Sequence, residues 1–405
     1  SFTLIELLIV IAIIGILASV VVLILNPSQL LSQSRDSRRI QDLSNVNNAI
    51  GIYLSEGNTS MGSGNTVYVS IPDSSSTCGS PTGSDLSLPT IPGGWSYHCV
   101  STTSLRNTDG TGWIPVNFTQ ISTGSPIPVL PVDPVDSKDY YYAYAVGTSS
   151  VYEITSSFES DKYQSRAAGS GNTDPTTYAV GNNLSLTPFI HGLVGAWNFN
   201  DASGGLNSTT ADLSGWENNG TLLDATSTGT GPTYTTSGCL SGGCLSFDGA
   251  DDFVRVLNNV SINPNASNFT VNVWFYANSV SAGILYNKEN LYEAEVSSEC
   301  GQNGCYAWQP NWAWDGQNFN ATTGVWTMMT IVYDHSNQYL YKNGALVYSR
   351  SQTGNMGSDT NNLTFAARSD GASVFYNGLL DDVSMYDTAL TPSQVRAIYN
   401  AEKTQ

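Results

Sequence analysis

Residues 2–25 read FTLIELLIVIAIIGILASVVVLIL, and this stretch decides how the rest of the chain can be organised. It is 24 residues long and contains one charged side chain, Glu6. An apolar run of this length predicts a helix that can span a bilayer. It lacks the basic start and the small-residue cleavage site of a secretory signal peptide, so that interpretation is disfavoured. A single carboxylate inside an apolar span is costly and indicates a functional role for Glu6.

A second helix is predicted directly after the first. Asn26-Pro27 should break the helix, because the residue before a proline is pushed out of helical geometry. From residue 28 to about residue 56, apolar side chains recur at steps of three and four, as on one face of a helix. These side chains are Ile40, Leu43, Val46, Ile50 and Tyr53. We expect this helix to end near Gly57.

Strands and loops follow in residues 58–188. Residues 140–146 (YYYAYAV) and 151–156 are predicted strands, and the proline-rich run 126–134 before them must be extended. A long helix followed by an antiparallel sheet is an α+β arrangement.

The pattern changes again in residues 192–401. Short alternating strands recur between turn signals, which is typical of an all-β sandwich. The segments are AWNF, LSFDG, DFVRV, FTVNVWFY, WTMMTIVYD, YLYKNG, LTFAAR and DDVSMY. Residues 390–401 (LTPSQVRAIYNA) predict a final helix, with Thr391 as its cap and Pro392 at its first position.

Charge and cysteine content restrict the class of protein. With 14 basic and 33 acidic residues, the net charge is −19, which argues against nucleic acid as a partner. Six cysteines allow fifteen pairings. Their spacing favours the simplest set, and structural disulfides indicate an oxidising, extracytoplasmic compartment. The predicted pairs are Cys78–Cys99, Cys239–Cys244 and Cys300–Cys305.

The N-terminal residues 2–10, FTLIELLIV, resemble the start of mature type IV pilins and type II secretion pseudopilins. The resemblance implies that a peptidase cuts before the phenylalanine, that the new amine is methylated, and that the glutamate pairs with a neighbouring subunit's amine. It makes Ser1, Phe2 and Glu6 the expected assembly residues. Ser1 precedes Phe2, so Glu6 stands one place later than in the family, which leaves the amine donor open.

A shorter match lies in the middle of the chain. Residues 130–134 (LPVDP) followed by 140–144 are similar to a segment of major pseudopilins, in which a nearby loop can bind calcium. Asp133, Asp136 and Asp139 could supply oxygen ligands. The alternative is a solvated acidic turn.

Residues 192–401 resemble a bacterial laminin-G-like, concanavalin A-like domain, on the stretches 192–200, 212–222, 245–254 and 378–386. The resemblance implies a jelly-roll sandwich of two sheets that often holds one calcium ion. The first candidate ligands are Asp212, Asn219, Asp248 and Asp382. Asp201 and Asp251 are the next candidates. The alternative is that these residues cap turns.

Such domains usually bind glycans or proteins, and exposed aromatic rings stack on sugars. The expected ligand-binding residues are Trp308, Trp312 and Trp314, with Trp216 as a further candidate; the alternative is that they pack in the core. Some concanavalin A-like proteins are glucanases. Glu293, Glu295 and Glu299 lack the central aspartate and the spacing of that motif, so we expect no enzyme.

These observations combine into a three-part prediction. Residues 1–57 are a pilin helix, 58–188 an α+β pilin domain and 192–401 a laminin-G-like sandwich. The predicted function is a major pilin of an extracellular filament that displays the sandwich for adhesion. The alternatives are a minor tip adhesin or a pseudopilin. The predicted partners are other copies, a prepilin peptidase with its assembly machinery, the inner membrane before assembly, and a glycan or surface protein.

Overall fold

The computed structural model describes residues 3–79, 86–147, 150–201, 203–226, 229–265, 268–297 and 303–403, and in the first helix it describes side chains only for residues 4–18. Four of the residues discussed above therefore lie outside the described residues, namely Ser1, Phe2, Glu299 and Cys300.

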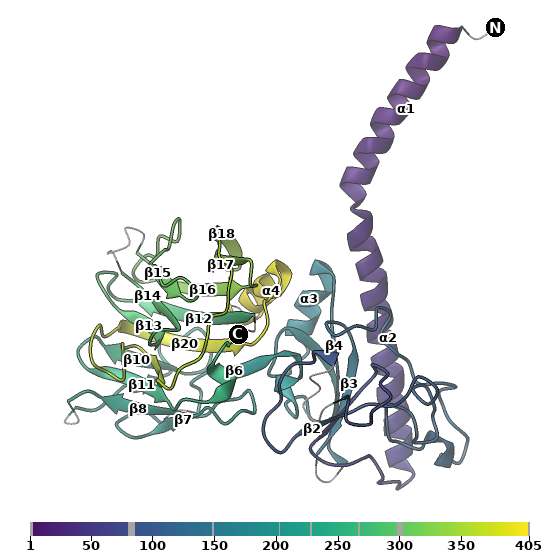
Figure 1. Ribbon diagram of the computed structural model, residues 1–405, viewed down its shortest axis with the longest axis horizontal. Helices are drawn as coiled ribbons and strands as arrows, with labels where there is room; N and C mark the ends of the chain where they lie inside the picture. The colour runs from purple at the N-terminus through teal and green to yellow at the C-terminus, as the bar shows by residue number, and fades with distance from the viewer. Residues whose placement is uncertain are drawn as a thin grey trace.

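Two consecutive helices form a rod at the N-terminal end, α1 (Leu4–Leu25) and α2 (Pro27–Ser55) (Figure 1). They meet at Asn26, whose φ of 38° and ψ of 75° are left-handed. Asparagine tolerates this conformation better than most residues. Pro27 then opens α2 at a position where its missing N–H costs no hydrogen bond. The predicted break at Asn26-Pro27 is confirmed.

Helix α1 projects from the folded body, and its apolar side chains are exposed, for example 82% of Leu4 and 58% of Leu17 (Figure 1). Within the described residues, no helix is long and apolar enough to cross a membrane. This finding contradicts the predicted localisation, in which residues 2–25 anchor the chain in the cytoplasmic membrane before it enters an extracellular filament.

Helix α2 packs on the N-terminal sheet through the apolar face predicted for it. Leu43, Val46, Ile50 and Tyr53 are buried in a core that they share with side chains of the sheet. The sheet is antiparallel except for the pair β1–β2, which is parallel. Its strand order is β2 (Ser96–His98), β1 (Thr66–Val69), β3 (Tyr142–Val146), β4 (Tyr152–Ser157) and β5 (Thr177–Gly181). Helix α3 (Asp161–Ala168) connects the last two strands.

The C-terminal part is a sandwich of two antiparallel sheets. The first runs in the order β18 (Ala345–Ser351), β17 (Asn337–Lys342), β16 (Trp326–Tyr333), β12 (Phe269–Ala277), β20 (Asn377–Tyr386), β10 (Cys244–Asp248) and β9 (Thr233–Thr235), and β6 (Leu193–Trp197) also pairs with β20. The second runs β15 (Cys305–Trp308), β14 (Tyr292–Glu295), β13 (Ile284–Lys288), β19 (Leu363–Phe365), β11 (Asp252–Val256), β8 (Gly220–Asp224) and β7 (Thr209–Thr210).

One apolar core fills the space between these two sheets. Val271, Val273 and Phe275 enter it from one sheet, and Tyr292 and Phe365 enter it from the other. Every strand segment predicted for this region overlaps a strand of the structure, although AWNF and LTFAAR do so only in their first half. The final helix is α4 (Pro392–Glu402), capped by Thr391 and opened by Pro392 as predicted.

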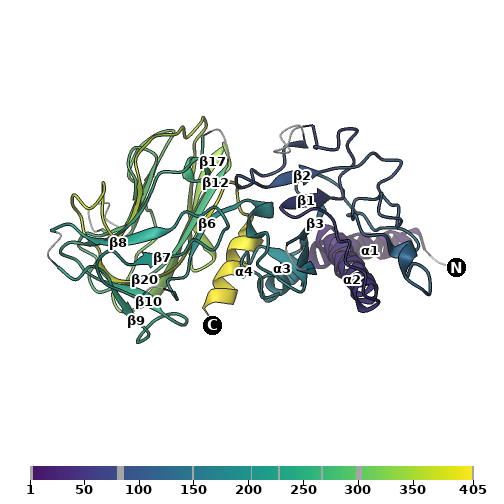
Figure 2. The same cartoon turned by 90° about the horizontal axis from the view of Figure 1, so that it is seen from below.

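The sandwich lies directly against the N-terminal part, with α3 and α4 side by side between them (Figures 1 and 2). Hydrogen bonds between described residues cross this contact. The Tyr386 hydroxyl donates to Asp174 Oδ1 over 3.3 Å, and Thr90 Oγ1 donates to Asp387 Oδ2 over 3.0 Å. Trp216 packs against apolar residues of both parts. The contact therefore holds the two parts in a defined arrangement.

Two of the predicted disulfides, Cys78–Cys99 and Cys239–Cys244, are confirmed. No described cysteine is free. The pair Cys300–Cys305 stays a prediction, because Cys300 is outside the described residues.

Candidate functional site

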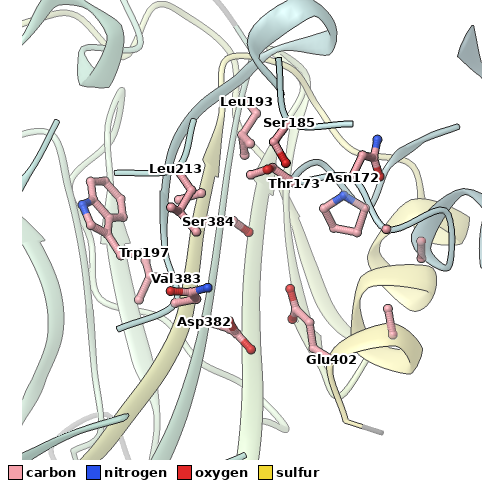
Figure 3. Close-up of a pocket in the computed structure, with 16 residues that line it drawn as sticks. Asn172, Thr173, Ser185, Leu193, Trp197, Leu213, Asp382, Val383, Ser384 and Glu402 are labelled. Atoms are coloured by element: carbon pink, nitrogen blue, oxygen red, sulfur yellow. The ribbon is translucent and has the colours of Figure 1, made fainter. Parts of the chain in front are cut away.

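A cavity of about 240 Å³ lies where the N-terminal part meets the sandwich (Figure 3). Residues 168–185, which include the end of α3, form one wall, and strands β6 and β20 with the end of α4 form the other. Polar side chains line the first wall, among them Asn172, Thr173 and Ser185. Figure 3 shows Asp382 of β20 and Glu402 of α4 facing the same space from the second wall.

A β-bulge in strand β20 places Asp382 in this cavity. Asn272 of β12 pairs with Ser384, but Trp274 pairs with Asp381, so two residues of β20 stand opposite one residue of β12. Asp382 lies in this bulge with a left-handed φ of 39°. A bulge breaks the alternation of side chains and often turns one toward a functional site.

Asp381, Asp382 and Glu402 form a group of interacting carboxylates. Burial raises the pKa of Asp382 to about 7, and burial together with Asp382 raises that of Asp381 to about 8. Burial and Asp382 also raise the pKa of Glu402 well above its usual range. Among the described residues, none of the three carboxylates is in an ion pair with a Lys or Arg. The group can therefore be neutralised by protons or by a bound cation.

Neutral donors hold part of this acidic group in place. Trp274 Nε1 donates to Glu402 Oε2 over 2.6 Å, and the backbone N–H groups of Leu240 and Asp382 donate to the two oxygens of Asp381. Only Asp382 was predicted as a site residue. The sequence carried a signal for Asp381 as well. Neighbouring residues of a strand point to opposite faces, so one residue of the adjacent pair Asp381-Asp382 in this apolar strand had to face the interior.

The predicted calcium ligands do not come together as one site. Asp212 is nearly buried, and its carboxylate accepts four hydrogen bonds, from Ala196, Asn218 and Ser214. The Asn219 side chain accepts a bond from the Asp212 backbone. These contacts of Asp212 and Asn219 are typical of a turn. Asp382 instead belongs to the group of carboxylates that it forms with Asp381 and Glu402.

A different acidic cluster satisfies the geometry of a metal site better. Carboxylate oxygens of Asp224, Asp251 and Asp252 lie within 4.8 Å of one another, the one such group of three found among the described residues. Burial raises the pKa of Asp252 to about 6, and the charge of Asp248 adds to this effect. Asp248 also contacts Asp252 directly through its backbone N–H. Two of the predicted candidates, Asp248 and Asp251, therefore lie at this corner.

The acidic loop of the N-terminal part holds an arginine in the position predicted for calcium. Asp133 is buried, and its two oxygens accept hydrogen bonds of 2.7 and 2.8 Å from Arg39 of α2. Arg39 is fully buried and also pairs with Asp36 and Glu159. A guanidinium therefore already neutralises the Asp133 carboxylate, while calcium binding at this loop stays untested.

The predicted tryptophans differ in accessibility. Trp308 is fully buried in the sandwich core, so its prediction as a surface ligand-binding residue is wrong. Strand alternation explains this, since Tyr306 and Trp308 point inward from β15 together. Trp312 is half-buried, and Trp314 is 39% exposed. Trp312 and Trp314 remain candidates for contact with a ligand from solvent, whereas the half-buried Trp216 packs between the two parts.

Two of the glutamates considered for catalysis, Glu293 and Glu295, lie on β14, and Glu299 is outside the described residues. Tyr292 and Ala294 point into the core, so Glu293 and Glu295 point to the opposite face. Glu293 is fully buried 3.7 Å from Arg368, and burial raises its pKa to about 7. The expectation that the chain is not an enzyme stays a prediction.

Glu6 caps its own helix. Its carboxylate accepts hydrogen bonds of 2.8 Å from the backbone and from the hydroxyl of Thr3, and Thr3 in turn accepts one from the Glu6 backbone. These bonds from Thr3 lower the pKa of Glu6, so it is charged at neutral pH. The intermolecular pairing of Glu6 stays a prediction.

The C-terminal part is thus a sandwich of two facing antiparallel sheets around one core, and its match to a family model supports a laminin-G-like, concanavalin A-like domain. Residues 219–396 match a laminin-G family model described as the "Concanavalin A-like lectin/glucanases superfamily". The match covers less than half of the chain, and the N-terminal part lies outside it. No curated protein matches the chain.

Solved structures with a similar fold include domain 4 of an extracellular arabinanase from Geobacillus stearothermophilus in complex with arabinotriose, at 17% identity and a TM-score of 0.40 over 51% of this chain and 98% of that one. The binding domain of Paraclostridial Mosquitocidal Protein 1 is 18% identical, with a TM-score of 0.40 over 52% of each chain. The botulinum neurotoxin serotype D domain in complex with N-acetylneuraminic acid is 15% identical, with a TM-score of 0.38 over 52% of this chain and 50% of that one. The alignments thus span about half the length of each toxin domain.

Proposed function

We propose that the chain is the structural subunit, a major pilin, of a type IV pilus-like filament, and that its laminin-G-like domain binds carbohydrate. The proposed role as a filament subunit rests on helix α1. Apart from Glu6, its described side chains are apolar on every face and exposed, from Leu4 through Ile11 to Leu17. A helix that is apolar all round requires partners on all sides. Burial of each large side chain would contribute about 1.5–3 kcal/mol.

Other copies of the same chain are the partners we propose for α1. Repetition of one heterologous contact between identical subunits builds a helical polymer, with the apolar helices at its centre. A charged Glu6 in such a centre needs a cationic neighbour, because an unpaired buried carboxylate is strongly destabilising. The pilin resemblance supplies that neighbour as the N-terminal amine of another subunit.

A variant series at Glu6 tests this proposal. We expect Glu6→Leu and Glu6→Gln to abolish filaments, because both remove the charge that selects the neighbouring amine. Thr3→Val is the matched control, since it removes the hydroxyl that bonds Glu6 but keeps the carboxylate. Electron microscopy of filaments purified from cells that make each variant is the measurement. Normal filament yield from Glu6→Leu would overturn the assembly role, and images of the wild type would show whether the sandwich repeats at every subunit.

We propose calcium as a ligand of the corner formed by Asp224, Asp251 and Asp252. Calcium binds six to eight oxygens, and clustered carboxylates with nearby backbone carbonyls are the usual donors. We expect millimolar calcium to raise the melting temperature of the wild type by several degrees, since a ligand at 100 times its Kd stabilises by about 2.7 kcal/mol. Asp251→Asn should remove this rise and Asp382→Asn should keep it. Calcium-independent melting in calorimetry would contradict the proposal.

The proposal that the laminin-G-like domain binds carbohydrate rests on the match of this domain to a lectin and glucanase superfamily. The proposal gives the chain no catalytic role.

A further inference from the structure

A second and larger cavity, of about 670 Å³, lies at another place along the contact between the two parts. The N-terminal part contributes residues 87–90, 138–141, 157–159 and 191, and the sandwich contributes Asn268, His335, 387–389, Thr391 and Gln394. We call this cavity the interdomain cleft. Its volume is in the range of cavities that hold small organic ligands. It exists only while both parts are in contact, so neither part carries it alone.

Two buried polar atoms of the cleft residues have no hydrogen-bond partner. Asp387 Oδ1 and His335 Nε2 are both buried and unsatisfied. The other oxygen of Asp387 accepts a bond from Thr90, so the carboxylate is held in a fixed orientation. A buried polar atom without a partner costs about 1–3 kcal/mol, and most native structures avoid it. A polar ligand in the cleft would remove this cost.

The other histidine of the cleft is already satisfied. His191 lies between Ser157 and Thr155, with its Nδ1 3.2 Å from Ser157 Oγ and its Nε2 3.3 Å from Thr155 Oγ1. Burial lowers the pKa of His191 to about 4, so the ring is neutral at neutral pH. This side chain is a rigid part of the wall and has no free hydrogen-bonding atom for a ligand.

Aromatic rings and hydroxyl groups complete the lining. Tyr140 is half-buried, with the Arg39 guanidinium 5.0 Å from its ring centre. Tyr141 and Phe158 are buried beside it. Thr388, Thr391 and other polar side chains offer further donors and acceptors. Tyr141 packs against His191 and Phe158 stacks on Tyr178, so these two rings shape the wall from inside the protein. The hydroxyl, amide and carboxylate groups of the lining match the hydroxyl groups of a sugar.

The charge of the lining selects between kinds of glycan. Lys138 is the one Lys or Arg among the described lining residues, and it lies 3.1 Å from Asp139. Glu159 is paired with Arg35 and Arg39. The cleft therefore offers no unpaired cation to a carboxylate, sulfate or phosphate group, and Asp387 would repel one.

We propose that the interdomain cleft binds a neutral oligosaccharide, with Asp387 Oδ1 accepting a hydrogen bond from a sugar hydroxyl and His335 Nε2 bonding a second one. This inference rests on the proposed carbohydrate binding of the sandwich and adds its position and the charge class of the glycan. The N-terminal part completes the site, so the glycan bridges the two parts.

A glycan array that carries both neutral and sialylated oligosaccharides tests the inference with the full chain. We expect a neutral glycan to bind, and Asp387→Asn and His335→Ala each to weaken its binding at least tenfold. Asn keeps the shape of Asp387 but presents a donor where the sugar needs an acceptor, so Asp387→Asn separates binding from folding. Asp382→Asn makes the same chemical change in the smaller cavity and should leave binding unchanged. Melting curves of each variant confirm that it is folded.

The outcomes separate the inference from the proposed function. If a glycan binds to the wild type and equally well to Asp387→Asn and His335→Ala, the interdomain cleft is not the binding site, but the proposed carbohydrate binding still stands. A loss of binding in Asp382→Asn alone would move the site to the smaller cavity. A preference for sialylated glycans would overturn the charge argument. If the wild type binds no glycan, both the inference and the carbohydrate part of the function fail.

Discussion

Arg39→Met is expected to destabilise the N-terminal part by about 3–5 kcal/mol, the usual cost of removing one partner from a buried ion pair. Arg39 is fully buried and joins Asp36 of α2 to Asp133 and Glu159. Burial by itself lowers the pKa of Arg39, but the hydrogen bonds and charges of its partner carboxylates outweigh that effect and raise it. Methionine keeps the apolar length of the side chain and leaves Asp36 and Asp133 without their cation, while Glu159 keeps its ion pair with Arg35. Denaturant unfolding of the purified chain measures the loss.

Arg38→Met is the matched control for this prediction. Arg38 is the preceding residue of the same helix, 57% of its side chain is exposed, and it lies 3.5 Å from Asp42. Exposed pairs of this kind contribute about 0–1 kcal/mol. We therefore expect Arg38→Met to change the free energy of unfolding by less than about 1 kcal/mol. Equal losses in the two variants would show that Arg39 stabilises only through its apolar contacts.

The Arg39 network also shows where prediction from the sequence ends. Periodicity placed Leu43, Val46 and Ile50 on the buried face of α2, and the structure agrees. It could not show that Arg39 is fully buried while its neighbour Ile40 is only half-buried. The partners Asp133 and Glu159 lie 94 and 120 positions away along the chain, and no local pattern encodes such pairings.

The strands of the sandwich, in contrast, could be predicted from the sequence, as could the buried face of α2. Each strand is a short run rich in apolar, β-branched and aromatic residues between turn signals, so the signal is local. The two cavities were not predictable, because both exist only through the relative placement of the two parts. Asp382 was chosen from a family resemblance for calcium, and the β-bulge that turns it into the smaller cavity depends on the pairing of β20 with β12.

Asp382→Asn is expected to raise the melting temperature at pH 8 and to reduce the dependence of stability on pH. Burial raises the pKa of Asp382 to about 7, against about 3.9 in an unfolded chain. Asparagine resembles the protonated carboxyl, and it tolerates the left-handed φ of 39° at this position. We expect the variant to be more stable than the wild type at pH 8 by about 2–4 kcal/mol. Thermal unfolding at several pH values between 4 and 8 is the measurement.

The sign of this effect follows from proton linkage. Between pH 4 and 7 the folded chain binds a proton at Asp382 that the unfolded chain has lost, so the free energy of unfolding falls as the pH rises. The stabilisation is complete below about pH 4 and is lost as the pH passes through about 7. Asp381 and Glu402 have raised pKa values in the same group, so part of the slope should remain in the variant. Asp139→Asn, at a carboxylate that is 64% exposed, should leave the wild-type curve unchanged. If Asp382→Asn also follows that curve, then Asp382 is ionised in the folded chain at neutral pH, and a cation rather than a proton neutralises it.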